Sequence, residues 1–182
     1  AAKLYSHWVT VNYREAYNMF ACCGILFNHE SPLRGLEFVT RKITYNLAKI
    51  KLNHSKKFQL GNVHSKRDWG HAKDYIKAMW LILQKEEPKD YVVSSNTTLS
   101  VREFIEKSFL KKNIVVKWEG EGLNEVGKDS NTGKVLVKIS DKYFRPCEVQ
   151  NLYGNSDLIR EELKWEPEFN INTLIEDMFN SN

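Results

Sequence analysis

Apolar residues recur with two different periods along the 182-residue chain, and they predict alternating helices and strands. Leu4, Trp8 and Val11 are spaced at i, i+4 and i+7, which predicts an amphipathic helix over residues 1 to about 19. Residues 21–27 are a continuous apolar run, which is typical of a parallel strand buried on both faces. Further short apolar runs predict strands at 57–60, 90–94 and 114–118.

The remaining periodic segments predict helices. We expect them at 38–52, from Gly70 to about Lys85, from Ser100 to about Lys111, and at 156–163 and 172–180. The second of these should carry one apolar face, formed by Ala72, Ile76, Met79, Trp80 and Leu83. Ser100 and Glu103 fit a capping box, in which each side chain satisfies a free backbone N–H of the first helical turn.

Two segments show no regular period. Residues 119–134 are polar and rich in glycine, and they predict a long surface loop. Residues 143–148 predict an irregular segment. Because helices and strands alternate in the rest of the chain, the predicted fold class is α/β.

Composition narrows the class of protein. The chain is 42% hydrophobic and 12% aromatic, as expected of a globular protein, and no apolar run approaches the ~18 residues of a membrane span. Its three cysteines, two of them adjacent at 22 and 23, have neither a disulfide nor a metal-ligand spacing, so we expect no metal and a cytoplasmic location. The net charge of +4 suits an anionic ligand or a nucleic acid.

The start of the helix predicted at 38–52 is a candidate anion site. Backbone N–H groups, the helix dipole and the side chains of Thr40, Arg41 and Lys42 would together favour a pyrophosphate. An ordinary basic helix face is the alternative, because solvated lysines such as Lys49 and Lys51 are common in this region.

Further polar candidates follow the predicted strands. Asn28, after the run 21–27, lies where ligands gather in open α/β sheets, and this position favours ligand binding over the alternative of strand capping and turn formation. Gly61, next to Asn62, would allow close approach of the backbone to a ligand. Arg67, expected just before a helix, can chelate phosphate; a salt bridge to Asp68 or Asp74 is the alternative.

Several of these segments resemble one family. The runs Arg67-Asp68-Trp69-Gly70-His71-Ala72-Lys73 and Phe38-Val39-Thr40-Arg41-Lys42 resemble the GDP-mannose 4,6-dehydratase family of extended short-chain dehydrogenases/reductases. Residues 143–149 resemble its Phe-Arg-Pro-x-Glu-Val segment, and 163–167 resemble a Leu-Gly-Trp-x-Pro ending with Lys164 in place of glycine. Ala1-Ala2-Lys3 resembles the end of the Tyr-x-x-x-Lys motif, which implies that an N-terminal half precedes this chain.

The resemblance implies the C-terminal part of a Rossmann-type doubly wound parallel sheet with a smaller mixed α/β lobe. Residues 1–36 and 65–98 would end the NADP-binding domain, and 37–64 and 99–182 would form the nucleotide-sugar lobe. The glycine-rich turn and the catalytic tyrosine would lie upstream, so this chain alone should be inactive.

The implied reaction is an internal redox cycle. NADP takes hydride from C4 of the mannose of GDP-mannose, water is lost across C5–C6, and hydride returns to C6. The product, GDP-4-dehydro-6-deoxy-D-mannose, is a precursor for GDP-fucose or rhamnose-type pathways. Lys3 would be catalytic and, with His29 and Arg34, would bind cofactor. Substrate would be bound by Asn28, Thr40, Arg41, Lys42, Gly61, Asn62, Arg67, Arg145 and Glu148.

The family resemblance also implies a homo-oligomer, either a dimer or a tetramer. Leu33 stands where relatives usually have the first of two arginines, in a loop that reaches a neighbouring subunit's cofactor. Two other interpretations compete: another nucleotide-sugar epimerase or dehydratase, and a non-enzymatic nucleotide-sugar or RNA-binding module. Most aromatic residues have core-like spacings rather than alternating with Lys and Arg, so we expect no nucleic-acid partner and no membrane partner.

Overall fold

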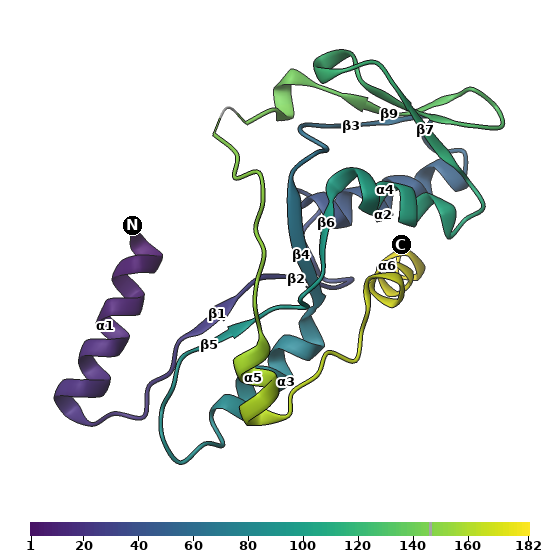
Figure 1. The fold of residues 1–182 in the computed structure, drawn as a ribbon. Coiled ribbons are helices and arrows are strands. Elements are labelled where there is room, and N and C mark those ends of the chain that lie inside the picture. Colours follow the sequence, from purple (N-terminus) through teal and green to yellow (C-terminus); the bar gives the residue numbers. More distant parts are fainter. Residues whose placement is uncertain (146) are drawn as a thin grey trace.

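The computed structural model describes residues 1–145 and 147–182 and has an α/β fold (Figure 1). Its helices are α1 (Ala2–Tyr17), α2 (Val39–Lys51), α3 (Ala72–Ile82), α4 (Val101–Leu110), α5 (Asp157–Leu163) and α6 (Ile171–Asn180). Single 3-10 turns form η1 (Gly122–Asn124) and η2 (Asp141–Tyr143). All the predicted helices are confirmed, as is the Ser100–Glu103 capping box that starts α4.

The strands form three small sheets. β1 (Gly24–Leu26) pairs in parallel with β5 (Tyr91–Val93). β4 (Lys66–His71) lies between β2 (Asn28–Glu30), which is parallel to it, and β6 (Thr98–Ser100), which is antiparallel. The third sheet has the order β3 (Phe58–Leu60), β9 (Val135–Ile139), β8 (Val126–Asp129) and β7 (Val116–Glu119).

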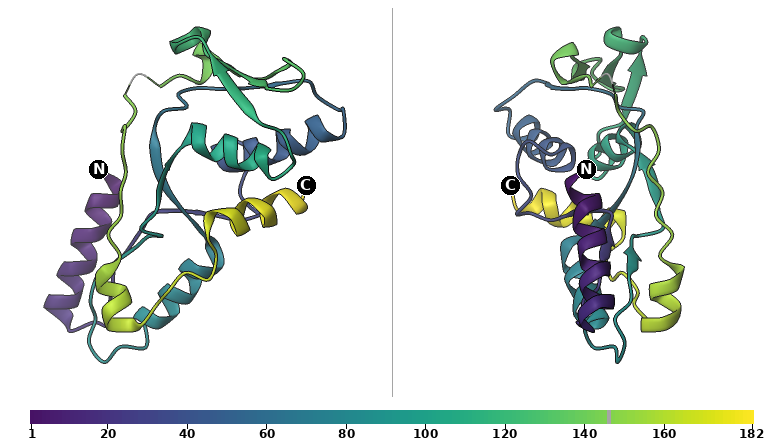
Figure 2. Two further views of the ribbon diagram at one scale, coloured as in Figure 1. Left: turned by 45° about the vertical axis from the view of Figure 1, so that its right-hand side comes forward. Right: turned by 90° about the vertical axis from the view of Figure 1, so that its left-hand side faces the viewer.

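Two hydrophobic cores hold these elements together. The larger core lies between the four-stranded sheet and helices α2, α4 and α6, and it includes Leu47, Phe104, Val137 and Ile175. Figure 2 shows α2 and α4 beneath this sheet, with α6 below them. The smaller core joins α3, β5 and the α5 region through Tyr75, Tyr91, Ile159 and Trp165. No helix in the described part of the chain is both long and apolar enough to cross a membrane.

The parallel strand predicted within residues 21–27 is confirmed, but its length and its burial on both faces were predicted wrongly. The strand covers only Gly24–Leu26, and among the described residues it pairs with β5 alone. Ile25 is 48% exposed because no described element covers its side of this two-stranded sheet. Residues Asn28–Glu30, which follow the predicted strand, form a separate strand beside β4.

The segment around Arg67 was also predicted wrongly. Lys66–His71 is a strand whose backbone pairs with both β2 and β6, so the following helix starts at Ala72 and not at Gly70. His71 begins α3, because its Nδ1 accepts a hydrogen bond from the Lys73 N–H at 3.1 Å.

The apolar face predicted for helix α3 is not its buried side. The buried side carries Asp74, Tyr75, Ala78 and Ile82. Most of the predicted apolar face is exposed to solvent, including Ile76, Trp80 and Leu83. The predicted apolar face exists, but no described element packs against it.

Residues 119–134 are not a long loop. They contain η1 and β8, which pairs with β7 on one side and β9 on the other. Gly127 fits here because a Cβ would lie 3.0 Å from Val116 Cγ1. The strand β9, which the sequence analysis did not predict, closes the turn at Gly133, where φ is +67°.

Lys164 ends α5 in the left-handed conformation, with φ of 51°, as its position in the ending motif suggested. We expect Lys164→Gly to raise the free energy of unfolding by about 0.5–1 kcal/mol, because glycine adopts this conformation without a Cβ penalty. Urea denaturation measures the change.

Lys111 provides the matched control, because it ends α4 in the right-handed conformation. Lys111→Gly should lower stability or leave it unchanged. A lower unfolding midpoint for Lys164→Gly would show that the side chain of Lys164 contributes more than its backbone strain costs.

Candidate functional site

A groove of about 470 Å³ brings together most of the residues predicted to bind substrate. It lies where β2, β4, the start of α2, the end of β3 and η2 approach one another. Its walls include the predicted residues Asn28, Arg34, Lys42, Gly61, Asn62, Arg67, Arg145 and Glu148. Pro146, which belongs to the same motif as Arg145, lies outside the described residues.

The pairing of β3 with β9 builds one side of this groove. The Ser140 N–H donates to the Leu60 carbonyl at 2.8 Å, so the chain after β9 turns across the end of β3. At Gly61 an added Cβ would lie only 2.1 Å from the Tyr143 carbonyl oxygen. Gly61 therefore allows close approach of another segment of this chain.

Positive charge dominates the groove. Five cationic side chains line it, and two carboxylates accompany them: Arg34, Lys42, Arg67, Lys142 and Arg145 with Glu37 and Glu148. Lys42 Nζ lies 3.5 Å from the centroid of the Tyr143 ring. Burial, and then the charge of Lys142, lowers the pKa of Lys42. An anion bound here would be stabilised by cations that are already partly desolvated.

Arg67 forms its ion pair with another predicted site residue. Its Nη2 lies 3.4 Å from Glu148 Oε1, and its Nη1 donates to the Lys66 carbonyl at 2.7 Å. The two acidic neighbours considered from sequence are used elsewhere, because Asp68 accepts the Ser95 N–H and Asp74 accepts two N–H groups after Pro167. The guanidinium of Arg67 thus remains at the groove wall.

Two of the predicted residues on α2 do not line the groove. Thr40 is buried, and its hydroxyl donates to Glu30 Oε2 at 2.6 Å. Arg41 Nη1 donates to the Met178 carbonyl on α6 at 3.3 Å. In this structure both side chains therefore bind other parts of the chain and do not face the groove.

Asn62 lines the groove, but its side chain also shapes the turn after β3. Its Oδ1 accepts the His64 N–H at 2.8 Å, and its Nδ2 donates to Ser65 Oγ at 2.8 Å. Such a turn is the common local use of asparagine.

Glu30 was not predicted as a site residue, and no motif in the sequence distinguished it. Its buried carboxylate accepts from Thr40 and lies 3.2 Å from Arg34 Nε, while the Arg34 guanidinium covers the Phe38 ring at 3.5 Å. Burial raises the pKa of Glu30, although Thr40 and Arg34 oppose the shift. Glu30 therefore holds Arg34 at the rim of the groove.

The other predicted cofactor residues lie outside the groove. Lys3 is exposed on α1, which has no buried residue. His29, on β2, has its Nδ1 3.0 Å from the Phe27 carbonyl and its ring 5.2 Å from that of Tyr75.

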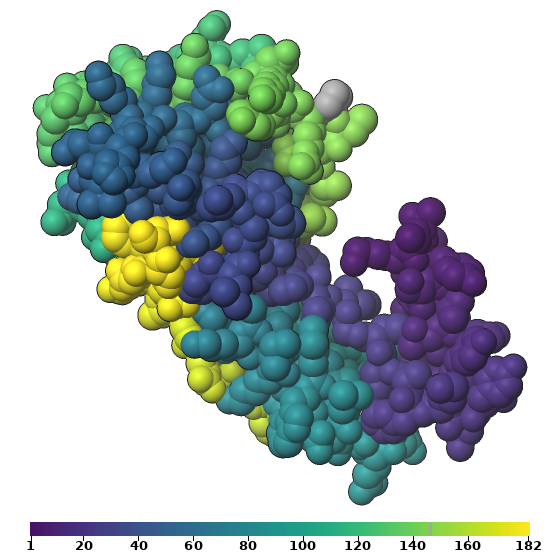
Figure 3. Space-filling view, turned by 180° about the vertical axis from the view of Figure 1, so that it is seen from behind, coloured from purple at the N-terminus to yellow at the C-terminus, as the bar shows by residue number. Residues whose placement is uncertain are grey.

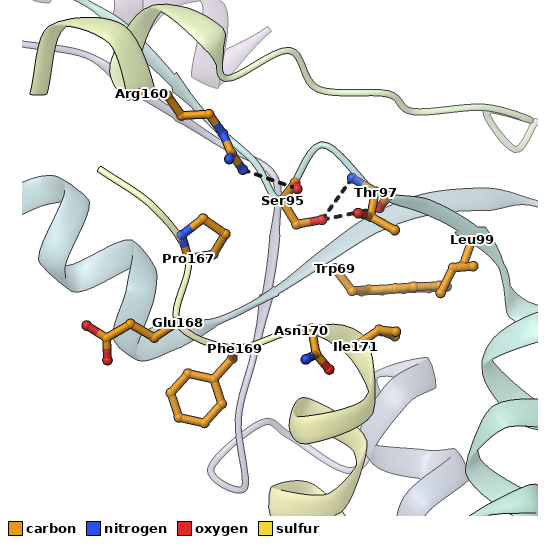
Figure 4. Close-up of a pocket in the computed structure, with 10 residues that line it drawn as sticks. All are labelled: Trp69, Ser95, Thr97, Leu99, Arg160, Pro167, Glu168, Phe169, Asn170 and Ile171. Carbon is orange, nitrogen blue, oxygen red and sulfur yellow. Dashed lines mark hydrogen bonds between the residues drawn. The ribbon is translucent and has the colours of Figure 1, made fainter. Parts of the chain in front are cut away.

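A second cavity, of about 390 Å³, lies between the β5–β6 connection, α5 and the segment before α6 (Figure 4). Its polar side chains largely satisfy one another. Ser95 Oγ hydrogen-bonds to the backbone of Thr97, and Arg160 donates to the Ser95 carbonyl. With its polar groups already engaged, this cavity is a weaker candidate for an anionic ligand than the groove.

One group of potential metal ligands was not anticipated. The ligand atoms of His7, Cys23 and Asp90 lie within 4.8 Å of one another. Both oxygens of Asp90 are bonded to Arg14, however, at 2.7 and 3.3 Å, and burial raises the pKa of the Cys23 thiol. Because a metal needs a thiolate and an unneutralised carboxylate, we assign no ion to this group.

Comparison with known proteins agrees with these motifs. The family model described as GDP-mannose 4,6 dehydratase matches residues 1–178. The human GDP-mannose 4,6 dehydratase is 53% identical over 178 residues, which are 98% of this chain and 48% of that protein. The enzyme from Sinorhizobium fredii (strain HH103) is 49% identical over 96% of this chain and 50% of its own length. The chain thus spans about half the length of the curated relatives it matches.

Solved structures support the fold. RMD from Pseudomonas aeruginosa, complexed with NADPH, superposes with a TM-score of 0.78 at 16% identity, covering 98% of this chain and 53% of that one. The dTDP-glucose 4,6-dehydratase from Bacillus anthracis, in complex with NAD, gives 0.74 at 16% identity, covering 96% and 48%. The α/β fold of this chain is therefore the Rossmann-type fold of these structures.

The contact at Gly61 leads to a first prediction for the groove. We expect Gly61→Ala to cost about 1–3 kcal/mol of unfolding free energy, because the new Cβ would force the Tyr143 carbonyl away. Gly24→Ala is the control, since its Cβ would meet only the end of the Leu26 side chain at 3.3 Å. Equal urea midpoints for the two variants would contradict the close contact.

The opposite pKa shifts of two glutamates lead to a second prediction. The pKa of Glu30 is raised above its ordinary 4.5 by burial, whereas hydrogen bonds from Ser100 lower that of Glu103. Stability from Glu30 is present below its ordinary pKa and is lost as the pH rises through the raised value. Stability from Glu103 is present above its ordinary pKa and is lost as the pH falls through the lowered one.

The destabilisation caused by Glu30→Gln should therefore be largest near about pH 4 and should shrink toward about pH 7. Glu103→Gln should show the reverse trend. Urea denaturation of both variants and the wild type across this range measures the trends, and parallel pH profiles would refute the assignment of Glu30 as a buried, readily protonated carboxyl.

Proposed function

Because the chain belongs to the GDP-mannose 4,6-dehydratase family, we propose that it acts in the conversion of GDP-mannose to GDP-4-dehydro-6-deoxy-D-mannose, a hydro-lyase reaction. Its own part in this reaction is to bind and orient the nucleotide sugar in the groove. The names of relatives about half identical to the chain support this assignment.

The observation that carries the proposal is the charge of the groove. Five cations face two carboxylates, and Glu148 already pairs with Arg67, so the remaining charge favours an anion. A volume of about 470 Å³ suits a ligand larger than a single phosphate. A nucleoside diphosphate has both the size and the charge that these walls would accept.

Each residue then has a role that its chemistry allows. Arg67 would hold two oxygens of the diphosphate with its planar fork, and Lys42 would add a point charge. The Asn28 amide would hold a further oxygen. Arg145 would meet phosphate or ribose, and Glu148, released from Arg67, would accept hydrogen bonds from ribose hydroxyls or guanine.

We further propose that the cofactor is NADP, with Lys3, His29 and Arg34 as contacts. The names of two structural neighbours, one with NADPH and one with NAD, support a nicotinamide dinucleotide. Arg34 fits such a group because Glu30 and Phe38 hold its guanidinium where a phosphate could approach. When bound, the dinucleotide supplies a reversible hydride acceptor, and Lys3 could hydrogen-bond its ribose.

The same proposal assigns a domain to each part of the chain. Residues 1–36 and 65–98 would belong to the dinucleotide-binding domain, and 37–64 and 99–182 to the substrate lobe. We propose a cytoplasmic homo-oligomer. The exposed loop at Leu33, itself 94% exposed, is the part of the cofactor side that a second subunit could contact.

Arg67→Lys tests the proposal. We expect it to weaken GDP binding by about tenfold or more, because lysine keeps the charge but loses the bidentate geometry. Calorimetric titration with GDP measures affinity, and a melting curve on the same variant should be nearly unchanged. Arg102→Lys is the control, because Arg102 pairs with Glu106 and Glu125 and does not line the groove.

Two outcomes would count against the proposal. Unchanged affinity with a lower melting temperature would make Arg67 a structural residue. Equal wild-type affinity for GDP and UDP, measured by competition in the same titration, would favour a different nucleotide-sugar enzyme of the superfamily.

A further inference from the structure

Lys142 lines the groove but belongs to none of the motifs singled out in the sequence. It lies in η2, between β9 and the irregular segment that contains Arg145. Its Nζ is 5.8 Å from the centroid of the Tyr143 ring, and Lys42 Nζ is 3.5 Å from the same centroid. The two nitrogens are therefore no further apart than about 10 Å, one Debye length at 0.1 M salt.

No described carboxylate lies within ion-pair distance of either ammonium group. Within the described ranges 1–145 and 147–182, neither lysine forms an ion pair, although thirteen such pairs occur elsewhere. Burial, and to a smaller extent the charge of Lys142, lowers the pKa of Lys42. Two ammonium groups near one aromatic ring repel each other. An anion bound near both would attract each of them and offset this repulsion.

Lys142 is held in this place by the backbone around it. The Tyr143 N–H donates to the Ser140 carbonyl at 3.1 Å, and the Phe144 N–H donates to the Asp141 carbonyl at 2.9 Å. The turn is anchored to β3 by the Ser140–Leu60 hydrogen bond and by the close packing of Tyr143 on Gly61. The position of Lys142 is thus set by the same contact that forms the groove wall.

We propose that Lys142 is a further phosphate-binding residue, which acts with Lys42 on one phosphate of a nucleoside diphosphate while the Tyr143 ring keeps the two ammonium groups in place. The inference rests on the function proposed above and adds a residue outside the segments that carried the resemblance. Lysine suits this role because its ammonium is a compact point charge on a flexible stem.

Titration with inorganic pyrophosphate, GDP and guanosine tests the inference on the protein as it exists. Lys142→Gln should weaken pyrophosphate and GDP by roughly fivefold to twentyfold and leave guanosine unchanged, because only the phosphates lose a charged donor. Lys138→Gln on β9 is the matched control, since it removes the same charge from an exposed strand position outside the groove.

Two further variants separate charge from folding. Lys142→Arg keeps the charge and should bind pyrophosphate within about twofold of the wild type. In the double variant Lys42→Gln/Lys142→Gln, the fold-loss of pyrophosphate affinity should be smaller than the product of the losses in the two single variants, because both lysines bind one phosphate. Independent, fully multiplicative losses would mean that the lysines contact different groups, and would overturn the shared site.

The outcomes distinguish the two proposals. Wild-type protein that binds neither GDP nor pyrophosphate overturns both. Wild-type protein that binds GDP with the Arg67 dependence described above, but whose affinity is the same with Lys142→Gln as with Lys138→Gln, overturns only the role of Lys142.

Discussion

Strand β4 is the constraint on which the rest of this structure depends. Its six residues pair with β2 on one side and β6 on the other, and the Lys66 backbone also bonds to Gln150 and Leu152. Three segments that are far apart in the sequence therefore meet along one short strand. The groove exists because this strand brings the region of Glu148 beside the loop after β2.

Successive residues of β4 make different contacts. Asp68 is buried and accepts the Ser95 N–H, which fixes the connection between β5 and β6. Trp69 lines both cavities and packs edge-on against Phe104 in the larger core. His71 starts α3 and, through Nε2, lies 3.0 Å from Asp177 on α6. Arg67 is free to face the groove because its neighbours on the strand make these structural contacts.

The sequence predicted elements whose signals are local. Helix α4 was predicted from its apolar period and its cap, both of which lie within a few residues. Strand β4 was missed because its partners β2 and β6 are distant in the sequence. Strand β8, which forms a hairpin with β9, was missed because it lies in the polar, glycine-rich segment 119–134. Polar residues on the exposed faces of such strands conceal the period of two that would identify them.

The candidate site shows the same limit. Thr40, Arg41 and Lys42 were all assigned to a ligand, but successive helical residues point about 100° apart. Only Lys42 among the three lines the groove. Lys142 had no signal at all, because a single lysine in a chain with 27 Lys and Arg residues is not distinctive until the fold places it beside Lys42.

The two parts of the structure differ in how much of their apolar surface they bury. The lobe around the groove encloses a core of seventeen buried hydrophobic residues, and the contacts that shape the groove all lie within the described chain. Helix α1 buries none of its residues and stands away from the body of the molecule in Figure 3, and the apolar side of α3 is exposed. Exposed apolar faces of this kind are typical of interaction surfaces. The contacts described for this lobe therefore fix the shape of the groove, whereas Lys3 lies on a helix that buries none of its own residues.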